Sequence, residues 1–543
     1  MYIMRSVLLL ALIIGTVVPS VGQQFNRQDS LRGSITEERA WWDLLHYHLD
    51  IKVDPAAKSI EGKNTVTYKV LDSSDYMQID LQSPMTLDKA MQNGKELTLK
   101  HEGNAHFIKM PEDLKMGNEY QLELHFKGKP KEAENAPWDG GITWATDSSG
   151  LPFVASANQG IGASVWWPNK DHPYDEPNNG VLLSVEVPEN LMNVSNGRLI
   201  KTEKNKKAKT KTYHWEVKNP INNYGVNINV GDYVHFGEKY EGANGVLDMD
   251  YYVLSYNLEK AKKQFADAKR TIEAFEHWFG AYPFYEDSYK LVEVPYLGME
   301  HQSSVTYGNG YQNGYRGGDL SASGWGLKFD FIIIHETGHE WFANSITNSD
   351  VADMWLHESF TAYSENLYLE YHFGKEAGHE YVRGTRISIN NDRPIIGTYN
   401  VHHEGSGDMY YKGANMLHTI RYIINDDSKW REILRGLNKE FYHQTVSSEQ
   451  VEKYMSETSG IDLSKVFDQY LRTTMVPTLA YFEKEGKLFY KWENVVENFD
   501  MPIVLLVNNE PRKITPGSNW QLLDISGDTS QIKIHPDYYV GLL

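Results

Sequence analysis

The chain has 543 residues, which is too long for a single hydrophobic core, so about two to four domains are expected. Hydrophobic residues make up 41% and charged residues 23%, and this composition excludes a disordered or fibrous chain. The formal net charge of −20 at pH 7 disfavours binding to nucleic acid or to anionic membranes, so we expect neither as a partner. Because the sequence contains no cysteine, any metal ion has to be held by histidines and carboxylates.

The first 22 residues have the order of a secretory signal peptide. Arg5 precedes an apolar run over residues 7–18, and the small residues Ser20 and Gly22 follow it. An uncleaved membrane anchor is the alternative, but this run is short for a bilayer, which needs about 20 residues. We therefore expect export to the periplasm or the outside through a cleaved signal peptide over residues 1–22, with no stable membrane insertion afterwards.

Residues 23–255 predict a large antiparallel β domain. Short runs such as His48–Val53 and Gln121–Phe126 alternate apolar and polar residues, and turns rich in Gly, Asn, Asp and Pro separate them. Buried antiparallel strands with one polar face have this pattern.

Helical patterns dominate the next part of the chain, residues 256–475. Residues 259–279 carry apolar side chains at helical spacing and predict one amphipathic helix, which Gly280 caps. The tail, residues 476–543, returns to alternating patterns and predicts a small β-sandwich. The fold class is therefore multidomain α+β, with a mainly helical domain between two β domains.

The clearest chemical motif lies in residues 331–342, where an apolar run leads into the pattern HExxH. Residues four apart lie on one face of a helix, so the imidazoles of His335 and His339 are able to reach one ion. Glu336 is rotated by about 100 degrees from His335 and points beside that ion. Glu358, in the next helical segment, is expected to supply a third ligand.

Two histidines and one glutamate, with one position left for water, form a catalytic zinc arrangement, so we expect one zinc ion per chain at His335, His339 and Glu358. Glu365 lies two turns beyond Glu358 and is the candidate carboxylate that orients a ligand imidazole. Zinc lowers the pKa of bound water to about 7, and Glu336 is placed to accept the proton and pass it to a leaving amine. The alternative is a chance motif on an amphipathic helix, with Glu358 as a solvated charge.

These motifs and the predicted domain order resemble the aminopeptidase N family of zinc metallopeptidases, in the gluzincin group. The resemblance spans nearly the whole chain after residue 22 and implies a thermolysin-like catalytic domain between the two β domains. It also implies an aminopeptidase that removes N-terminal residues from peptides. The sequence ends after the small β domain, whereas many members continue into a large helical domain, so we expect a short form with a more open cleft.

One motif match implies how substrate is bound. The family's Gly-Ala-Met-Glu-Asn motif corresponds to residues 297–301, where Gly298 and Met299 contact substrate. Glu300 would bind the free α-ammonium group by charge-assisted hydrogen bonds, which restricts cleavage to the first residue. The sequence departs from the motif at three positions: Leu297, Gly298 and His301.

Further matches concern a tyrosine and a glutamine. The family's Tyr-x-Lys-Gly motif is matched from Tyr410 onward, which implies that Tyr410 donates its hydroxyl to the oxyanion, with Tyr411 one residue away as the alternative. Gln159 stands where the family places a substrate-contacting glutamine on the β domain. Trp166 and Trp167, which follow it, are expected in the core.

The third-ligand motif, usually Asn-Glu-Gly-Phe-Ala, here reads from His357 to Thr361, so the ligand is kept and its neighbours differ. Residues 308–326 contain seven glycines and predict a mobile rim near the site, with a simple surface insertion as the alternative. His301 and the pair His402 and His403 lack carboxylates at metal-ligand spacing, so we expect no second metal there.

The sequence supports three functions. The first is a zinc aminopeptidase with Glu336 as general base. The second is a zinc endopeptidase on the same scaffold, which the departures at Leu297 and His301 leave open. The third is a catalytically silent peptide-binding relative, against which the joint presence of the ligands, Glu336 and Tyr410 argues. Peptides are the expected substrates in the first two cases, and the oligomeric state is open.

Overall fold

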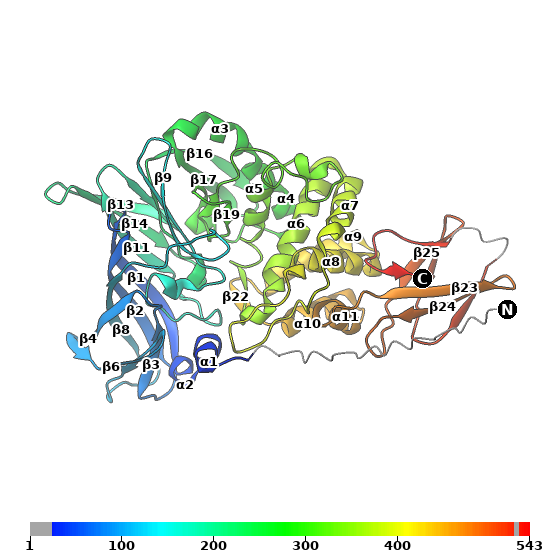
Figure 1. The fold of residues 1–543 in the computed structure, drawn as a ribbon, viewed down its shortest axis with the longest axis horizontal. Helices are drawn as coiled ribbons and strands as arrows, with labels where there is room; N and C mark the ends of the chain where they lie inside the picture. Colours follow the sequence, from blue (N-terminus) through cyan, green and yellow to red (C-terminus); the bar gives the residue numbers. More distant parts are fainter. Residues whose placement is uncertain (1–23, 526–531) are drawn as a thin grey trace, which may run out of the picture.

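The computed structural model describes residues 24–525 and 532–543. The expected signal peptide over residues 1–22 lies outside these described residues. An N-terminal β-rich part, a mainly helical part and a C-terminal β part follow one another along the long axis of the molecule (Figure 1). This arrangement is the multidomain α+β fold predicted from the sequence. None of the helices within the described ranges is long and apolar enough to cross a membrane.

One large sheet organises the N-terminal part, with the strand order β13-β14-β11-β1-β2-β8-β4-β5. Its strand β1 (Trp42–Asp54) pairs antiparallel with β2 (Ser59–Val70) and parallel with β11 (Val181–Pro188), so the sheet is antiparallel except at that pair. Alternate side chains of β1 are buried, as the period-two pattern requires. The other strands are β4 (Thr86–Gln92), β5 (Lys95–Leu97), β8 (Glu119–Gly128), β13 (Arg198–Asn205) and β14 (Thr210–Val217).

Two smaller sheets complete this part, in the orders β12-β15-β10-β9 and β3-β7-β6. Gln159 follows β10, and Trp166 and Trp167 are fully buried, as expected of core residues. Short helices α1 (Arg27–Gly33) and α2 (Glu37–Ala40) precede β1. The strands are β3 (Tyr76–Asp80), β6 (Leu99–Glu102), β7 (Ala105–Lys109), β9 (Gly141–Thr146), β10 (Pro152–Ala157), β12 (Met192–Val194) and β15 (Asn229–Gly231).

A five-stranded sheet, in the order β16-β17-β18-β20-β19, joins the β-rich part to the helical part. Strand β17 (Gly245–Leu254) pairs antiparallel with β16 (Tyr233–Gly242) and parallel with β18 (Tyr289–Glu293). The boundary expected at residue 255 therefore falls within one sheet. Alternation of side chains predicts strands but does not indicate which strands pair, so this continuity could not be predicted from the pattern. The sheet ends with β19 (Gly298–Met299) and β20 (Val305–Tyr307).

The helical part differs in one element from the sequence prediction. The single helix expected over residues 259–279 is two helices, α3 (Leu258–Gln264) and α4 (Ala266–Phe279), which meet at Phe265. Gly280 ends α4 with a φ of 100°, as its predicted capping role requires. The remaining helices are α5 (Phe331–Gly338), α6 (Trp355–Phe373), α7 (Lys375–Gly384), α8 (Tyr411–Ile424), α9 (Asp427–Glu440), α10 (Ser448–Ser459) and α11 (Ser464–Arg472). Two short strands, β21 (Ile346–Asn348) and β22 (Gln444–Val446), pair in parallel.

The C-terminal part contains two sheets, as the expected sandwich requires. Strands β23 (Thr478–Lys484), β24 (Lys487–Glu493), β27 (Gln521–Asp524) and β29 (Gly541–Leu542) form the first sheet. Strands β25 (Ile503–Val507), β26 (Glu510–Ile514) and β28 (Ile532–Ile534) form the second. Leu479, Leu488 and Leu505 are fully buried between them, so each sheet has one apolar face.

Candidate active site

Helix α5 carries the predicted metal-binding motif. Its first turn is fixed by Asp330, whose carboxylate accepts a hydrogen bond from the backbone N–H of Ile332 at 3.2 Å and another from the hydroxyl of Tyr307 at 2.7 Å. The helix ends at Gly338, but His339 keeps helical dihedrals at the C-terminal cap. The imidazoles of His335 and His339 therefore lie on one face, as the four-residue spacing predicts.

Helix α6 brings Glu358 against these two imidazoles. The Oε2 atom of Glu358 lies 3.7 Å from Nε2 of His335 and 3.4 Å from Nε2 of His339. All three side chains are buried, and their candidate ligand atoms lie within 4.8 Å of one another. The structure thus brings together the three residues that the sequence predicts as metal ligands.

The far nitrogen of each imidazole has its own partner. Nδ1 of His335 lies 2.8 Å from Oε1 of Glu365, which is the contact expected for that carboxylate, and the hydroxyl of Tyr381 donates to Oε2 of Glu365 at 2.6 Å. Nδ1 of His339 lies 3.0 Å from the carbonyl of Phe342 and 3.0 Å from Oγ1 of Thr361. Such contacts fix the ring orientation and leave Nε2 of each histidine free for an ion.

The three side chains fit a zinc ion. Oε2 of Glu358 is buried and has no hydrogen-bond partner in the described part of the chain, which is costly for a carboxylate unless a cation balances it. Zinc holds nitrogen and oxygen ligands at about 2.0–2.2 Å, so tetrahedral ligand atoms lie roughly 3.3–3.6 Å apart. The separations of 3.4 and 3.7 Å are close to this range.

The contribution of Glu365 to the affinity for zinc can be tested. The variant Glu365→Gln is expected to lower the affinity for zinc by about 10- to 100-fold, because Nδ1 of His335 loses its charged partner. Competition against a chromogenic chelator measures this affinity. The exposed Glu380 on α7 offers a matched control, and Glu380→Gln should leave the affinity unchanged. Equal affinities for both variants would contradict the role of Glu365.

Glu336 lies beside the candidate ligands and not among them. It is almost fully buried, and burial raises the pKa of Glu336 to about 7. Gly298 packs closely here: a Cβ atom at that position would lie 2.6 Å from a methyl group of Ile332 and 3.1 Å from Oε1 of Glu336. The departure to glycine at 298 therefore leaves room for Glu336.

Glu300 and Gln159 close one end of the same pocket. Nε2 of Gln159 donates to Oε1 of Glu300 at 2.7 Å and to Oε1 of Glu358 at 2.9 Å, so this side chain of the β-rich part bridges the two carboxylates. Burial raises the pKa of Glu300, whose backbone carbonyl accepts from Asn344 at 2.8 Å. Met299 lines the pocket beside them.

Tyr410 faces the candidate ligands from the start of α8. Its ring stacks on His335 with the centroids 6.0 Å apart, and burial raises the pKa of Tyr410 far above neutrality, so the hydroxyl keeps its proton. Oγ of Ser359 donates to the carbonyl of Met409 at 2.6 Å and fixes the segment that carries Tyr410. Tyr411 also lines the pocket.

The pocket over these residues has a volume of about 650 Å³. Its walls include Trp138 of the β-rich part and Tyr315 and Leu320 of the glycine-rich segment, which therefore lies at the rim of the site as expected. Asn309 fixes this segment through hydrogen bonds to the carbonyls of Gln312 and Gly314, at 2.9 Å each. These bonds argue against the mobility predicted for the rim.

Sequence reasoning missed several residues of the site. Thr361 contacts the candidate ligand His339, and Tyr381 contacts Glu365. Arg393 and Glu404 line the pocket. Thr361 stands where the family has alanine, so the departure itself was the available signal. Tyr381, on α7, gave no signal, because the contact depends on how α7 packs against α6.

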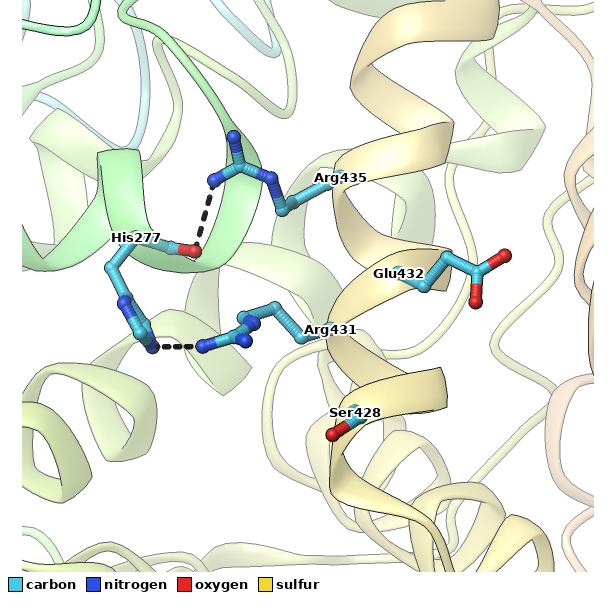
Figure 2. Close-up of a pocket in the computed structure, with 5 residues that line it drawn as sticks. All are labelled: His277, Ser428, Arg431, Glu432 and Arg435. Atoms are coloured by element: carbon cyan, nitrogen blue, oxygen red, sulfur yellow. Dashed lines mark hydrogen bonds between the residues drawn. The ribbon is translucent and has the colours of Figure 1, made fainter.

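Another hollow lies on the outer face of the helical part, between α4 and α9 (Figure 2). Nη1 of Arg431 is 2.9 Å from Nε2 of His277, and Nη1 of Arg435 donates to the carbonyl of Glu276 at 2.7 Å. Arg435 therefore engages the C-terminal end of α4, where a cation is favourable. These contacts fasten two helices and bring no catalytic group together.

Two models of one peptidase family match the chain. The model described as Peptidase M1 N-terminal domain matches residues 44–224, and the one described as Peptidase family M1 domain matches residues 263–470. The chain belongs to the M1 peptidase family. This finding confirms the resemblance to the aminopeptidase N family. The second match includes all three candidate ligands of this M1 peptidase.

Curated relatives of the M1 peptidase are distant in sequence. It is 23% identical to "Probable aminopeptidase 2" of Sulfurisphaera tokodaii, over 77% of this chain and 54% of that protein. It is 20% identical to the leucyl aminopeptidase of Saccharolobus solfataricus, over 82% of this chain and 58% of that protein. The chain thus spans about half the length of these relatives.

Solved structures share the fold of the M1 peptidase. A mutant of the M1 zinc metallopeptidase from Deinococcus radiodurans, bound to the substrate Tyr-Ser-Ala, aligns with a TM-score of 0.68 at 20% identity. The alignment covers 81% of this chain and 96% of that chain.

Proposed function

We propose that this M1 peptidase is a zinc aminopeptidase that hydrolyses the first peptide bond of peptides. The observation that carries the proposal is the position of Glu300 in the same pocket as His335, His339 and Glu358. That carboxylate offers a site for a free ammonium group within reach of a hydrolytic centre. The aminopeptidase names of the relatives, and the tripeptide bound to the Deinococcus radiodurans protein, support this choice of substrate.

The metal would be held by Nε2 of His335, Nε2 of His339 and the carboxylate of Glu358. When bound, zinc makes hydroxide available from water near neutral pH and polarises the scissile carbonyl. Glu336 lies beside this position and accepts the proton of the attacking water, then delivers it to the leaving amine. The Tyr410 hydroxyl donates a hydrogen bond to the oxyanion that forms on the carbonyl oxygen. Glu365 orients the ring of His335.

Glu300 and Gln159 position the substrate. The carboxylate of Glu300 accepts charge-assisted hydrogen bonds from the substrate's ammonium group, and the amide oxygen of Gln159 offers a further acceptor. The two side chains are hydrogen-bonded to each other, so they offer their acceptors side by side in the pocket. Gly298 and Met299, on β19, lie along the pocket wall and contact the first residue of the substrate.

Blocking the substrate's N-terminus tests the proposal. Acetylation of a short peptide removes the ammonium charge that Glu300 binds, so we expect the acetylated peptide to resist cleavage while the free peptide is cleaved from its first residue. Mass spectrometry of the products checks this. Equal cleavage of both peptides, at an internal bond, would instead support a zinc endopeptidase, and no cleavage of either by zinc-loaded protein would support a silent peptide binder.

The variant Glu300→Gln examines the same contact from the side of the protein. A hydrogen bond to a charged group contributes about 1.5–3 kcal/mol, so kcat/KM for free peptides should fall by about 10- to 100-fold. Steady-state kinetics measures the change. Glu380→Gln alters an exposed carboxylate outside the pocket and serves as the control, with little change expected. Equal losses in the two variants would remove Glu300 from substrate binding.

Export is a further part of the proposal. It depends on the charged, apolar and small-residue order of residues 1–22, which lie outside the described residues. N-terminal sequencing of protein recovered from the periplasm or medium should begin near Gln23. Recovery of the uncleaved chain in the cytoplasm would refute it.

A further inference from the structure

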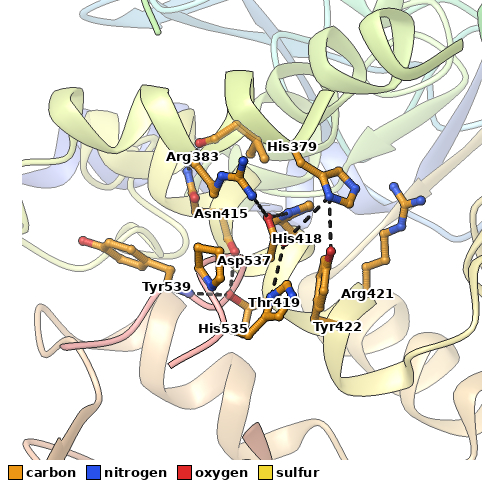
Figure 3. A network of polar contacts seen from close by, with 12 residues as sticks. His379, Arg383, Asn415, His418, Thr419, Arg421, Tyr422, His535, Asp537 and Tyr539 are labelled. Atoms are coloured by element: carbon orange, nitrogen blue, oxygen red, sulfur yellow. Dashed lines mark hydrogen bonds and ion pairs between the residues drawn. The ribbon is translucent and has the colours of Figure 1, made fainter. Parts of the chain in front are cut away.

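A separate group of buried histidine and carboxylate side chains lies where the C-terminal part meets the helical part (Figure 3). His379 on α7 and His418 on α8 face Asp537, which follows β28, and each of the three is at most 2% exposed. None of the three lines the pocket that holds Glu336. The proposed peptidase reaction therefore gives these side chains no role.

The atoms of this group face one another. Nε2 of His418 lies 2.9 Å from Oδ1 of Asp537, and Nδ1 of His379 lies 3.7 Å from Oδ2. The ring of His535 adds its Nδ1 atom 3.4 Å from Oδ2 of Asp537. That nitrogen is buried and has no hydrogen-bond partner among the described residues. A buried nitrogen without a partner is costly, and a metal ion would satisfy it.

We propose that His379, His418 and Asp537 bind a second, structural zinc ion, with His535 as the fourth ligand. Structural zinc sites are closed and four-coordinate, and three imidazoles with one carboxylate satisfy zinc without cysteine. Zinc ligands at about 2.0–2.2 Å from the ion lie roughly 3.3–3.6 Å apart in a tetrahedron. The separations of 3.7 and 3.4 Å from Oδ2 of Asp537 match those at the candidate catalytic site. Nε2 of His418, which is hydrogen-bonded to Oδ1 at 2.9 Å, would exchange that bond for the ion.

The polar groups around the two helical histidines differ. Nε2 of His379 points toward Oε2 of Glu370 at 4.0 Å, and Arg421 fixes both oxygens of Glu370 at 2.7 and 2.9 Å. Nδ1 of His418 lies 3.4 Å from the hydroxyl of Tyr363. Only the ring of His418 therefore has a polar group within reach of its far nitrogen. Nε2 of His379 has no hydrogen-bond partner among the described residues, and its Nδ1 lies 3.2 Å from the hydroxyl of Tyr422, a contact that the ion would replace.

The charges around Asp537 are compatible with a bound cation. Arg383 donates to Oδ1 of Asp537 at 3.1 Å and also to Glu376 at 2.6 Å, so its charge is shared between two carboxylates. Oδ2 of Asp537, which His379 and His535 face, is the oxygen that would bind the ion. Because Asp537 belongs to the C-terminal segment, the ion would fasten this segment to α7 and α8.

Metal analysis of the full chain tests the proposal. The background variant His335→Ala/His339→Ala removes the candidate catalytic site. After incubation with zinc and desalting, inductively coupled plasma mass spectrometry should find about one zinc ion per chain in this background and about none after His379→Ala/His418→Ala is added. His125→Ala, on the exposed side of the large β sheet, is the matched control and should keep the ion. If the background variant contains no zinc after this treatment, the proposal is wrong. The cluster would then hold the C-terminal segment by hydrogen bonds alone.

Thermal unfolding provides a second measurement that does not depend on the folding of the quadruple variant. Zinc binds the folded background variant, so its Tm should rise with added zinc and fall again with chelator. His535→Ala, which removes only the half-buried fourth ligand, should weaken this shift. A Tm that does not respond to zinc in the background variant would also overturn the proposal.

Discussion

The variant Glu336→Gln is expected to lower kcat by about 10²- to 10⁴-fold, the range over which general acid–base groups contribute. Glutamine keeps the volume of the side chain but cannot accept the proton of the attacking water. Because Glu336 is not one of the three candidate ligands, the zinc content should stay at the wild-type level. Single-turnover kinetics and metal analysis on the same preparation measure both quantities.

Glu380→Gln makes the same chemical change at an exposed residue of α7 and is the control. Its kcat should stay within a few-fold of wild type, because Glu380 does not line the pocket. Turnover of Glu336→Gln at the wild-type rate would exclude it as the base. Loss of zinc in that variant would mean that the residue supports the metal and not the proton transfer.

Removing the Tyr410 hydroxyl should have the second largest effect. Tyr410→Phe is expected to lower kcat by about 10²- to 10³-fold, as loss of one oxyanion donor does, with little change in KM. The hydroxyl acts on charge that develops only during the reaction, so substrate binding should not depend on it. Steady-state kinetics with a free peptide separates the two constants.

Tyr411→Phe resolves the one-residue ambiguity of the motif. Both tyrosines line the pocket, but Tyr410 is the one that stacks on His335. We expect Tyr411→Phe to keep most of the activity. A larger loss in Tyr411→Phe than in Tyr410→Phe would move the donor role to the neighbouring residue.

The candidate metal site was predictable because its spacing is local. His335 and His339 are brought together by one helix, and the apolar run before them predicts that the helix is buried. Glu358 needed a second predicted helix, because no periodicity sets the distance between α5 and α6. The separations at Oε2 of Glu358 agree with that prediction.

Packing contacts in the structure explain two departures from the family motifs, Ser359 and His357. A Cβ atom at Gly413 would lie 1.8 Å from Oγ of Ser359, so glycine at 413 accommodates the serine at 359. Nε2 of His357 accepts the backbone N–H of Asn348 at 2.9 Å, which anchors the first turn of α6. The first pair is 54 residues apart and the second is nine apart, and neither separation is a helix or strand repeat, so neither contact shows in a local pattern.

The cluster of His379, His418 and Asp537 was invisible to sequence reasoning for the same reason. Asp537 lies more than a hundred residues beyond His418, between β28 and β29. Metal-ligand spacing in sequence identifies sites built on one element or on neighbouring ones. His402 and His403, adjacent in sequence, belong to none of the candidate metal groups found within residues 24–525 and 532–543.

The break between α3 and α4 could not be predicted from the sequence for a different reason. Apolar periodicity continues through Phe265, where the backbone keeps right-handed dihedrals but the regular helix stops. A periodic pattern reports which side chains face the core, and both helices bury the same face. The pattern therefore gives no sign of the interruption.

Anomalous diffraction at the zinc absorption edge, from crystals of the wild-type chain, tests the central claim most directly. A peak about 2.0–2.2 Å from Nε2 of His335, Nε2 of His339 and a carboxylate oxygen of Glu358 is the predicted result. Crystals of zinc-loaded protein without a peak between these side chains, or with an ion there that Glu358 does not contact, would contradict it.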